Sequence, residues 1–166
     1  AGLKAGTGCK VQIVVKSSTG VTVTATLPLF KFLPHAANLT RSVTLRSENP
    51  SGARGHIASL GATDVDVRHA CMRSTGRSTN EPPHNTRFDA DGNVTQVGTN
   101  QIARYGLWHR HHHHGPFMLH GCVYHGDGKS KWPITIHGSH DGLVEANVVY
   151  HYLGSGVVEE DGTETN

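Results

Sequence analysis

Short runs of β-branched residues recur along this chain, and each is bounded by Gly, Pro, Asn, Asp or Ser. Runs of this length and composition are typical of β-strands. No apolar pattern of helical period extends over about ten residues or more. The sequence therefore predicts an all-β protein. The expected strands are 10–15, 21–27, 42–47, 64–70, 122–126, 133–138, 143–152 and 156–162.

The first two runs form one unit of the pattern. The stretch QIVVKSSTGVTVTAT (12–26) is typical of a β-hairpin that turns at residues 17–20, because Ser, Thr and Gly separate two alternating runs. We therefore expect residues 1–36 to form a short N-terminal β-hairpin segment that precedes a second region, 37–166.

From residue 42 onward, similar short units recur at a regular spacing along the chain. The run ITIH (134–137) begins like VVEE (157–160), which follows it at an offset of 23. Short strands that repeat at such a period are typical of a parallel β-solenoid, in which each coil stacks on the preceding one. An antiparallel sandwich is the alternative. The polar, turn-rich segment 77–103 is expected to be a long loop excursion from one coil, and such loops are often functional.

The stretch HRHHHHGPF, which begins at His109, places five histidines in six consecutive positions. Residues one coil apart in a solenoid lie about 4.8 Å from each other. Counting back 23 residues from Glu160 reaches His137, and counting back a further 26 residues reaches His111. His109 lies two residues before His111 and is expected to point the same way. Imidazoles and a carboxylate in one ladder suit a transition metal. A metal-free polar ladder or an exposed turn is the alternative, and for residues 112–114 we favour the exposed turn.

Three longer stretches resemble one known family. They are ANLTRSVTLRSENPSGARGHI (37–57), GTNQIARYGLWHRHHHHGP (98–116) and WPITIHGSHDGLVEANVVYHYLGSGVVEEDGTETN (132–166). They resemble secreted and cell-surface proteins in which a G8 domain is followed by a right-handed parallel β-helix. The resemblance implies such a β-helix over residues 37–166, and it makes residues 1–36 the tail of a G8-like domain that is otherwise missing.

The family pattern also implies a metal site. Its members carry an Arg-Tyr pair, a His-x-His element, a His-Gly-Ser element one coil later and then a Glu-Asp-Gly element. Here these elements fall on Arg104-Tyr105, His109/His111, His137-Gly138-Ser139 and Glu160-Asp161-Gly162, and RGH at 54–56 resembles a further element. The implied cofactor is a transition metal ion (Zn, Mn, Fe or Cu). Its implied ligands are His56, His109, His111, His137 and Glu160. The stretch from Tyr105 to Gly115 is one residue longer than the family pattern.

The resemblance further implies a function outside the cell. Hyaluronan-like glycans are the reference ligands of the family, so we expect an extracellular or cell-surface domain that binds or degrades an acidic polysaccharide. A degrading domain would be a metal-dependent glycoside hydrolase or polysaccharide lyase. Arg104 and Arg110 would pair with uronate carboxylates. Glu159, Asp161 and His140 would supply acid–base catalysis.

The alternative function is a non-catalytic module that has a structural or partner-binding role within a larger extracellular assembly. Other chains would then cap the ends of the solenoid. The net charge of +2 gives no reason to expect nucleic acid as a partner. No run of about 18 apolar residues predicts a membrane span. Cys9, Cys71 and Cys122 are far apart and lack the paired spacing of a zinc finger.

Overall fold

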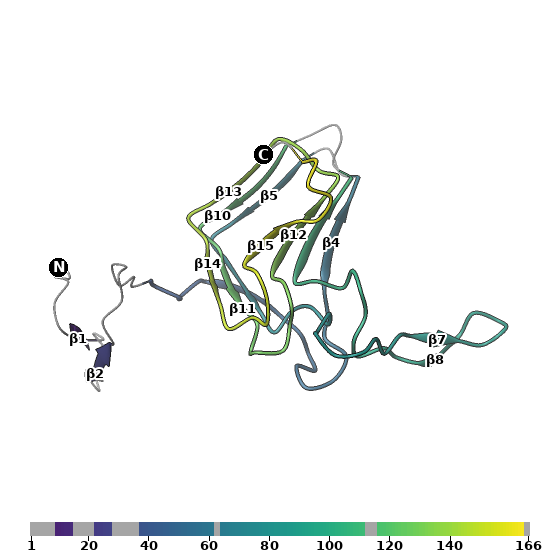
Figure 1. Ribbon diagram of the computed structural model, residues 1–166, viewed down its shortest axis with the longest axis horizontal. Coiled ribbons are helices and arrows are strands. Elements are labelled where there is room, and N and C mark those ends of the chain that lie inside the picture. The colour runs from purple at the N-terminus through teal and green to yellow at the C-terminus, as the bar shows by residue number, and fades with distance from the viewer. Residues whose placement is uncertain (1–8, 15–21, 28–36, 62–63, 112–115, 165–166) are drawn as a thin grey trace. The chain divides into compact units, whose positions relative to one another are not determined.

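The computed structural model describes residues 9–14, 22–27, 37–61, 64–111 and 116–164 (Figure 1). The chain divides into two compact units, Ala1–Asn38 and Leu39–Asn166. In the first unit, strands β1 (Cys9–Val14) and β2 (Thr22–Leu27) pair antiparallel. This pairing confirms the predicted N-terminal hairpin, whose turn at 17–20 lies outside the described residues.

The second unit is built from three parallel sheets, which we call sheets I, II and III (Figure 1). Sheet I contains β3 (Val43–Arg46), β6 (Ala70–Arg73), β11 (Val123–His125) and β14 (Val148–Tyr150). Sheet II contains β4 (Ile57–Leu60), β9 (Leu107–Arg110), β12 (Ile134–His137) and β15 (Val157–Glu159). Sheet III contains β5 (Val65–Arg68), β10 (Phe117–His120) and β13 (Gly142–Glu145). The chain therefore visits the sheets in a fixed order, I, II, III, and then returns to sheet I.

One passage through the sheets is one coil, and every strand pairing between successive coils is parallel. The described residues contain no helix, so the all-β prediction is confirmed, and the topology is compatible with the predicted β-solenoid. The antiparallel sandwich is wrong for this unit. Within the described part of the chain, no helix is present that could cross a membrane.

The side chains that face the interior form one hydrophobic core in the second unit. Its fully buried members are Ala70, Met72, Leu107, Phe117, Leu119, Cys122, Tyr124, Ile134 and Ile136. All of them come from the two middle coils or the turns between them, where a neighbouring coil covers each side. In the first coil, Val43 is 57% and Leu45 46% exposed, and in the last coil Val157 is 46% exposed, because no described strand lies beyond them.

Single residues with left-handed backbone turn the chain from one sheet to the next. Between sheets III and I these residues are His69, Gly121 and Ala146, with φ of 51°, 64° and 55°. The expected strands 64–70 and 143–152 are therefore each divided into two at such a corner. The physical reason is that one left-handed residue redirects an extended chain without a longer turn, and the β-branched run continues on both sides of it.

The segment 77–103 leaves the second coil between β6 and β9. It is more ordered than the predicted loop, because β7 (Arg87–Phe88) and β8 (Val94–Gln96) pair antiparallel within it. Backbone hydrogen bonds from Arg77 N to Arg104 O (2.7 Å) and from Gln101 N to Arg77 O (2.9 Å) close its base. Figure 1 shows this arm, with β7 and β8, extending away from the three sheets.

Candidate functional site at the end of sheet II

His137 ends strand β12 and lies between two carboxylates of the next coil. Its Nδ1 atom is 3.1 Å from Asp161 Oδ1 and 3.3 Å from Glu160 Oε2. The predicted offset of 23 is confirmed, because Ile134 pairs with Val157 in a parallel ladder. That register brings the residues after β15 beside the end of β12. We call His137, Glu160 and Asp161 the His137 cluster.

Two further side chains hold the carboxylates in place. The Tyr105 hydroxyl donates to Glu160 Oε1 at 2.7 Å, and Tyr105 is only 4% exposed. Burial and the bond to Glu160 raise the pKa of Tyr105, so the phenol keeps its proton and acts as a donor. Glu164 Oε1 accepts from the backbone N–H groups of Gly138 (3.1 Å) and Asp161 (3.2 Å), which fastens the two coils together.

The pKa of Glu164 reflects this role. Burial alone would raise it, but backbone N–H donors outweigh burial and lower the pKa of the carboxyl. No pattern in the sequence indicates this role of Glu164, since a glutamate in EEDGTETN is typical of a polar turn. Tyr105 was noted only as half of the Arg-Tyr pair, and no pattern in the sequence indicated its bond to Glu160.

His111 lies beside the cluster, but not in the predicted register. Leu107 pairs with Ile134, so His137 lies opposite Arg110 and not opposite His111. The predicted offset of 26 between these coils is therefore wrong by one. His111 has φ of 55° and forms the corner after β9, in the position that Gly138 occupies in the next coil. Its ring still approaches His137, with ring centroids 5.1 Å apart.

This contact explains the glycine at 138. A Cβ on that residue would lie 2.9 Å from His111 Cδ2, and its φ is +51°. On strand β9, the Arg110 guanidinium lies 5.0 Å from the centroid of the Trp108 ring. The centroids of the Trp108 and His137 rings are 6.1 Å apart. An aromatic ring and a cation therefore border the His137 cluster.

His109 does not point the same way as His111, contrary to the prediction. It pairs with Ile136, is fully buried and stacks on Phe117 at a centroid distance of 4.5 Å. Successive strand residues alternate faces. His109 therefore faces the interior, and the chain turns before His111 could return to that face.

His56 and Arg104 lie at the opposite ends of the sheet II strands from the His137 cluster. His56 precedes β4 and Arg104 precedes β9, whereas His137 ends β12. The Arg77 Nη1 atom is 3.4 Å from His56 Nδ1. Burial, Arg104 and Arg77 lower the pKa of His56 to about 4. Two neighbouring cations also disfavour a metal cation at this imidazole.

The remaining predicted residues occupy separate positions. Glu159 is exposed and pairs with the core residue Ile136, so it lies on the face opposite to Glu160 by strand alternation. His140 is partly buried in the corner between β12 and β13. Arg110 lies next to His137, whereas Arg104 does not, so the two predicted substrate-binding arginines are not brought together. Residues 112–114 lie outside the described residues.

The predicted metal ligands do not converge. Across residues 37–61, 64–111 and 116–164, no group of three or more His, Cys, Asp or Glu side chains is arranged to hold a metal ion. His109 faces the core and His56 lies at the far end of the sheet, so only His111, His137 and Glu160 of the five ligands are neighbours. The transition metal stays a prediction, and no step of the chemistry below depends on it.

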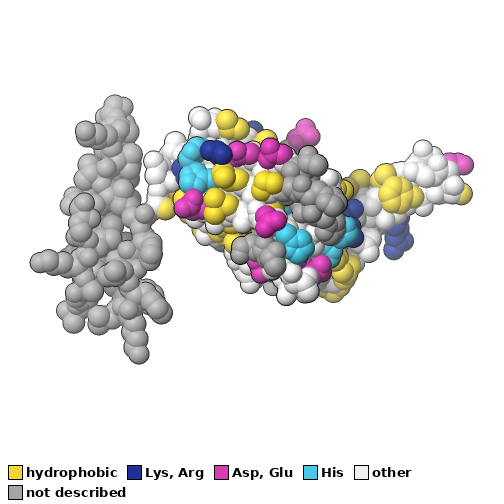
Figure 2. Space-filling view, turned by 90° about the horizontal axis from the view of Figure 1, so that it is seen from above, with side chains coloured by type: hydrophobic (Ala, Val, Ile, Leu, Met, Phe, Trp, Pro, Cys, Tyr) yellow, Lys and Arg dark blue, Asp and Glu magenta, His cyan; other side chains and the backbone are white. Residues whose placement is uncertain are grey.

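The His137 cluster is instead suited to proton transfer. A carboxylate beside Nδ1 favours the tautomer that carries its proton there, which leaves the Nε2 lone pair as the base. Figure 2 shows histidine side chains directly beside Asp and Glu side chains on one face of the molecule. A second pair of this kind, His120 Nδ1 with Glu145 Oε2 at 3.3 Å, lies at the end of sheet III. Within the described residues, His120 has no second carboxylate at ion-pair distance, although Asp66 lies near enough to interact with it electrostatically.

In comparisons with known proteins, no protein-family model, no curated protein and no solved structure matches the chain.

Proposed function

We propose that the second unit is a right-handed parallel β-helix of the G8-associated type, acting outside the cell on an acidic polysaccharide. The fixed visiting order of three parallel sheets supports the β-helix, and the motifs in three stretches of the chain support the resemblance. In this proposal the polysaccharide is bound and cleaved at the end of sheet II.

One observation carries the catalytic part of the proposal, namely His137 held by two carboxylates. Nδ1 lies 3.1 Å from Asp161 Oδ1 and 3.3 Å from Glu160 Oε2, so both carboxylates are close enough to pair with the imidazole. Arg110 lies on the adjacent strand, in register with His137 and about 4.8 Å from it along the sheet. A guanidinium at that place is suited to a uronate carboxylate.

The proposed reaction is a β-elimination on the uronate. His137 Nε2 removes the proton from the carbon next to the carboxylate, while Arg110 offsets the charge that develops on the carboxylate. The electron pair of that C–H bond forms a C=C bond, and the glycosidic C–O bond breaks. The imidazolium then returns its proton to the leaving oxygen, so protons and charge balance. Tyr105 is buried, so its role is to position Glu160 and not to contact the substrate.

The test is turnover of polyuronates, measured as absorbance of the unsaturated product and as new reducing ends. The variant H137Q should lower turnover by about 10²-fold or more, the size of a general-base contribution. The matched control is H120Q, which removes another histidine paired with a carboxylate and should leave turnover unchanged. Equal loss in both variants, with both chains folded by circular dichroism, would overturn the catalytic proposal. Reducing ends without absorbance would indicate hydrolysis instead of elimination.

The expectation of a transition metal is tested in the same preparations. Elemental analysis of the untagged protein, repeated for H111A and H137A, measures metal per chain. About one equivalent that is lost in both variants would support a metal site made with residues outside the described ranges. A metal-free chain with full turnover would support the metal-free reaction.

A non-catalytic module is the second candidate, and the terminal coils favour it. Val43 and Leu45 in the first coil and Val157 in the last coil leave apolar surface exposed that another chain could cover. Under this alternative, polyuronates are bound without any cleavage in the wild-type chain. Light scattering would then show a complex that V43S/L45S dissolves.

A further inference from the structure

The outer side of sheet I and the turns that follow its strands carry three hollows that share lining residues. Their volumes are about 330, 530 and 430 Å³. The first and second share Arg73, and the second and third share Pro50, Ser51 and Lys129. The hollows therefore adjoin one another, and we call the three together the sheet I groove.

The groove is strongly positive compared with the chain as a whole. Its acidic lining residues are Glu48, Glu81 and Asp127, and its basic ones are Arg41, Arg46, Arg54, Arg73, Arg77 and Lys129. Six cations against three carboxylates leave an excess of three positive charges, whereas the whole chain carries +2. The charge of this chain is therefore concentrated on the sheet I groove.

Two of these arginines lie directly opposite each other, so their positive charges repel. Arg46 and Arg73 pair directly across β3 and β6, about 4.8 Å apart along the sheet. Like charges directly opposite each other destabilise a sheet. Both side chains are exposed, and neither forms an ion pair with any carboxylate among the described residues. A bound anion would relieve this repulsion.

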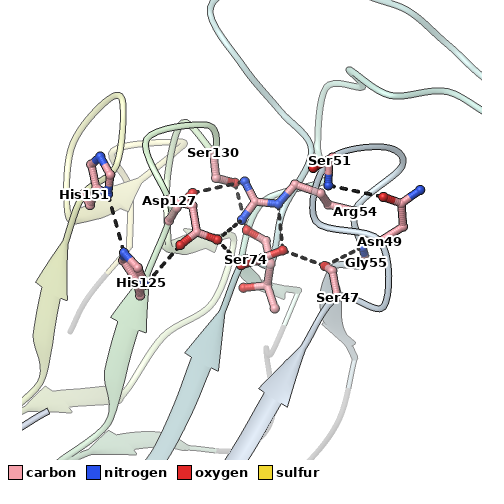
Figure 3. A network of polar contacts seen from close by, with 12 residues as sticks. Ser47, Asn49, Ser51, Arg54, Gly55, Ser74, His125, Asp127, Ser130 and His151 are labelled. Carbon is pink, nitrogen blue, oxygen red and sulfur yellow. Dashed lines mark hydrogen bonds and ion pairs between the residues drawn. The ribbon is translucent and has the colours of Figure 1, made fainter.

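The edge of the groove is rigid. Figure 3 shows Arg54 at the centre of a network that joins the turns after β6 and β11. Arg54 is 3% exposed and donates from Nε to Ser74 O at 2.7 Å and from Nη1 to Gly126 O at 3.0 Å. Its Nη2 is 3.8 Å from Asp127 Oδ2, and Ser74 Oγ also donates to that carboxylate.

Asp127 is therefore already compensated from within the protein. Its partners include His125, whose Nδ1 lies 3.1 Å from Asp127 Oδ1. Burial by itself would raise the pKa of Asp127, but Ser74, His125 and the nearby arginines outweigh burial and lower it. Asp127 is thus shared among Ser74, His125, Arg54 and Arg73, and the exposed side chains of Arg46 and Arg73 still border the groove together with Lys129.

We infer that the sheet I groove binds an extended acidic polysaccharide through its carboxylate or sulfate groups, separately from the His137 cluster on sheet II. Guanidinium groups bind such oxyanions through two parallel hydrogen bonds. Three hollows in a row suit an extended polymer better than a single small anion. The exposed hydroxyl of Ser51 suits a sugar hydroxyl.

A nucleic acid is less well matched to this surface. Single-stranded nucleic acids are bound by aromatic side chains on which bases stack. The one aromatic residue lining the three hollows, within the described residues, is Tyr150, and His125 already stacks on its ring at 4.3 Å. The lining thus offers charge and hydroxyl groups but few stacking surfaces.

The experiment is isothermal titration of the whole chain with size-fractionated dextran sulfate and polygalacturonate, and with neutral dextran as the blank. R46Q and R73Q should each weaken binding about ten-fold, the loss expected for one strong charge-assisted contact. The matched control R87Q removes one exposed arginine from the arm and should change affinity by far less. R73K should restore part of the affinity, because it returns the charge without the guanidinium fork.

Three results would overturn the inference. The first is equal weakening by R87Q and R73Q, which would indicate non-specific charge. The second is binding of inorganic sulfate as tight as binding of dextran sulfate, which would indicate a small-anion site. The third is tighter binding of single-stranded DNA than of either polysaccharide, lost in R73Q. H137Q should bind dextran sulfate normally, so failure of the proposed lyase activity and failure of this inference are distinguishable.

Discussion

The half-buried imidazole of His56 predicts a specific loss of stability in mild acid. Its Nδ1 is 3.4 Å from Arg77 Nη1, and Arg104 adds a second positive charge. Burial, Arg104 and Arg77 together lower the pKa of His56 from 6.5 to about 4. The folded protein therefore keeps this ring neutral at a pH where the unfolded chain already binds a proton.

The sign follows from proton uptake. Between pH about 6.5 and about 4, the unfolded chain holds more protons at His56 than the folded chain, so the free energy of unfolding falls as the pH falls. The full difference in pKa would correspond to about 3 kcal/mol. His56 is only half buried, and solvent screening reduces the expected loss to about 1 to 2 kcal/mol.

Urea unfolding at pH 7, 6, 5 and 4.5 measures this effect. Both tryptophans of the chain, Trp108 and Trp132, belong to the second unit, so their fluorescence follows the unfolding of that unit. The comparison variant is H56N, in which an amide oxygen can still accept from Arg77 but cannot titrate. Wild type should lose about 1 to 2 kcal/mol more than H56N between pH 7 and pH 4.5.

The other histidines are present in both proteins, so their contributions to the pH dependence of the free energy of unfolding cancel in the comparison with H56N. Equal pH slopes in the two proteins would refute the argument, because His56 would then have the same pKa folded and unfolded. A wild type that gains stability relative to H56N on acidification would show that the imidazole is protonated in the fold. The two arginines would then not set its charge.

Three further substitutions should destabilise the second unit, each measured by the same urea unfolding at pH 7. Y105F removes the 2.7 Å bond to Glu160 Oε1 and should cost about 1.5 to 3 kcal/mol, the value of a hydrogen bond to a charged group. G142A places a methyl group inside the ring of the buried Phe117 and should cost about 1 to 3 kcal/mol by overpacking. R54M leaves the buried carbonyl acceptors and one carboxylate without their cation and should cost about 3 to 5 kcal/mol.

G142A and R54M each have a matched control. G61A adds a methyl group to a left-handed glycine with no heavy atom within 4 Å of the new Cβ, so it should cost only the backbone strain of about 1 kcal/mol. R68M removes the exposed pair with Asp66, which should be worth about 1 kcal/mol or less. If G142A or R54M costs no more than its control, the packing or burial argument for that residue is wrong.

Much of the strand content could be predicted from the sequence, because β-branched runs and turn residues act locally. The offset of 23 between β12 and β15 was also predictable, since ITIH and VVEE are similar and no insertion separates them. That register brought His137 and Glu160 together. It depends on two consecutive coils of similar length and needs no knowledge of the side-chain packing.

The adjacent coil was harder to predict, because one residue decides which face a side chain occupies. An offset of 26 places His111 opposite His137, whereas the true offset of 27 places Arg110 there. A slip of one residue moves each strand side chain to the other face of a sheet. His109 was assigned to the outer face for this reason, although it stacks on Phe117 in the core.

The corner residues explain why His111 still reaches the cluster. Gly61, His111 and Gly138 occupy the same corner in three successive coils, each with a positive φ. The N–H groups of Gly61 and His111 extend the ladder, to Arg110 O at 3.0 Å and to His137 O at 2.9 Å, whereas the Gly138 N–H donates to Glu164 Oε1. The side chain of a corner residue does not follow the alternation of faces along the strand. The direction in which it points therefore cannot be deduced by counting residues from the strand before it. In a chain of this kind, site residues are therefore better aligned from corner to corner than from strand to strand. Glycine marks two of these three corners, and a histidine in the third is then the residue to test for function.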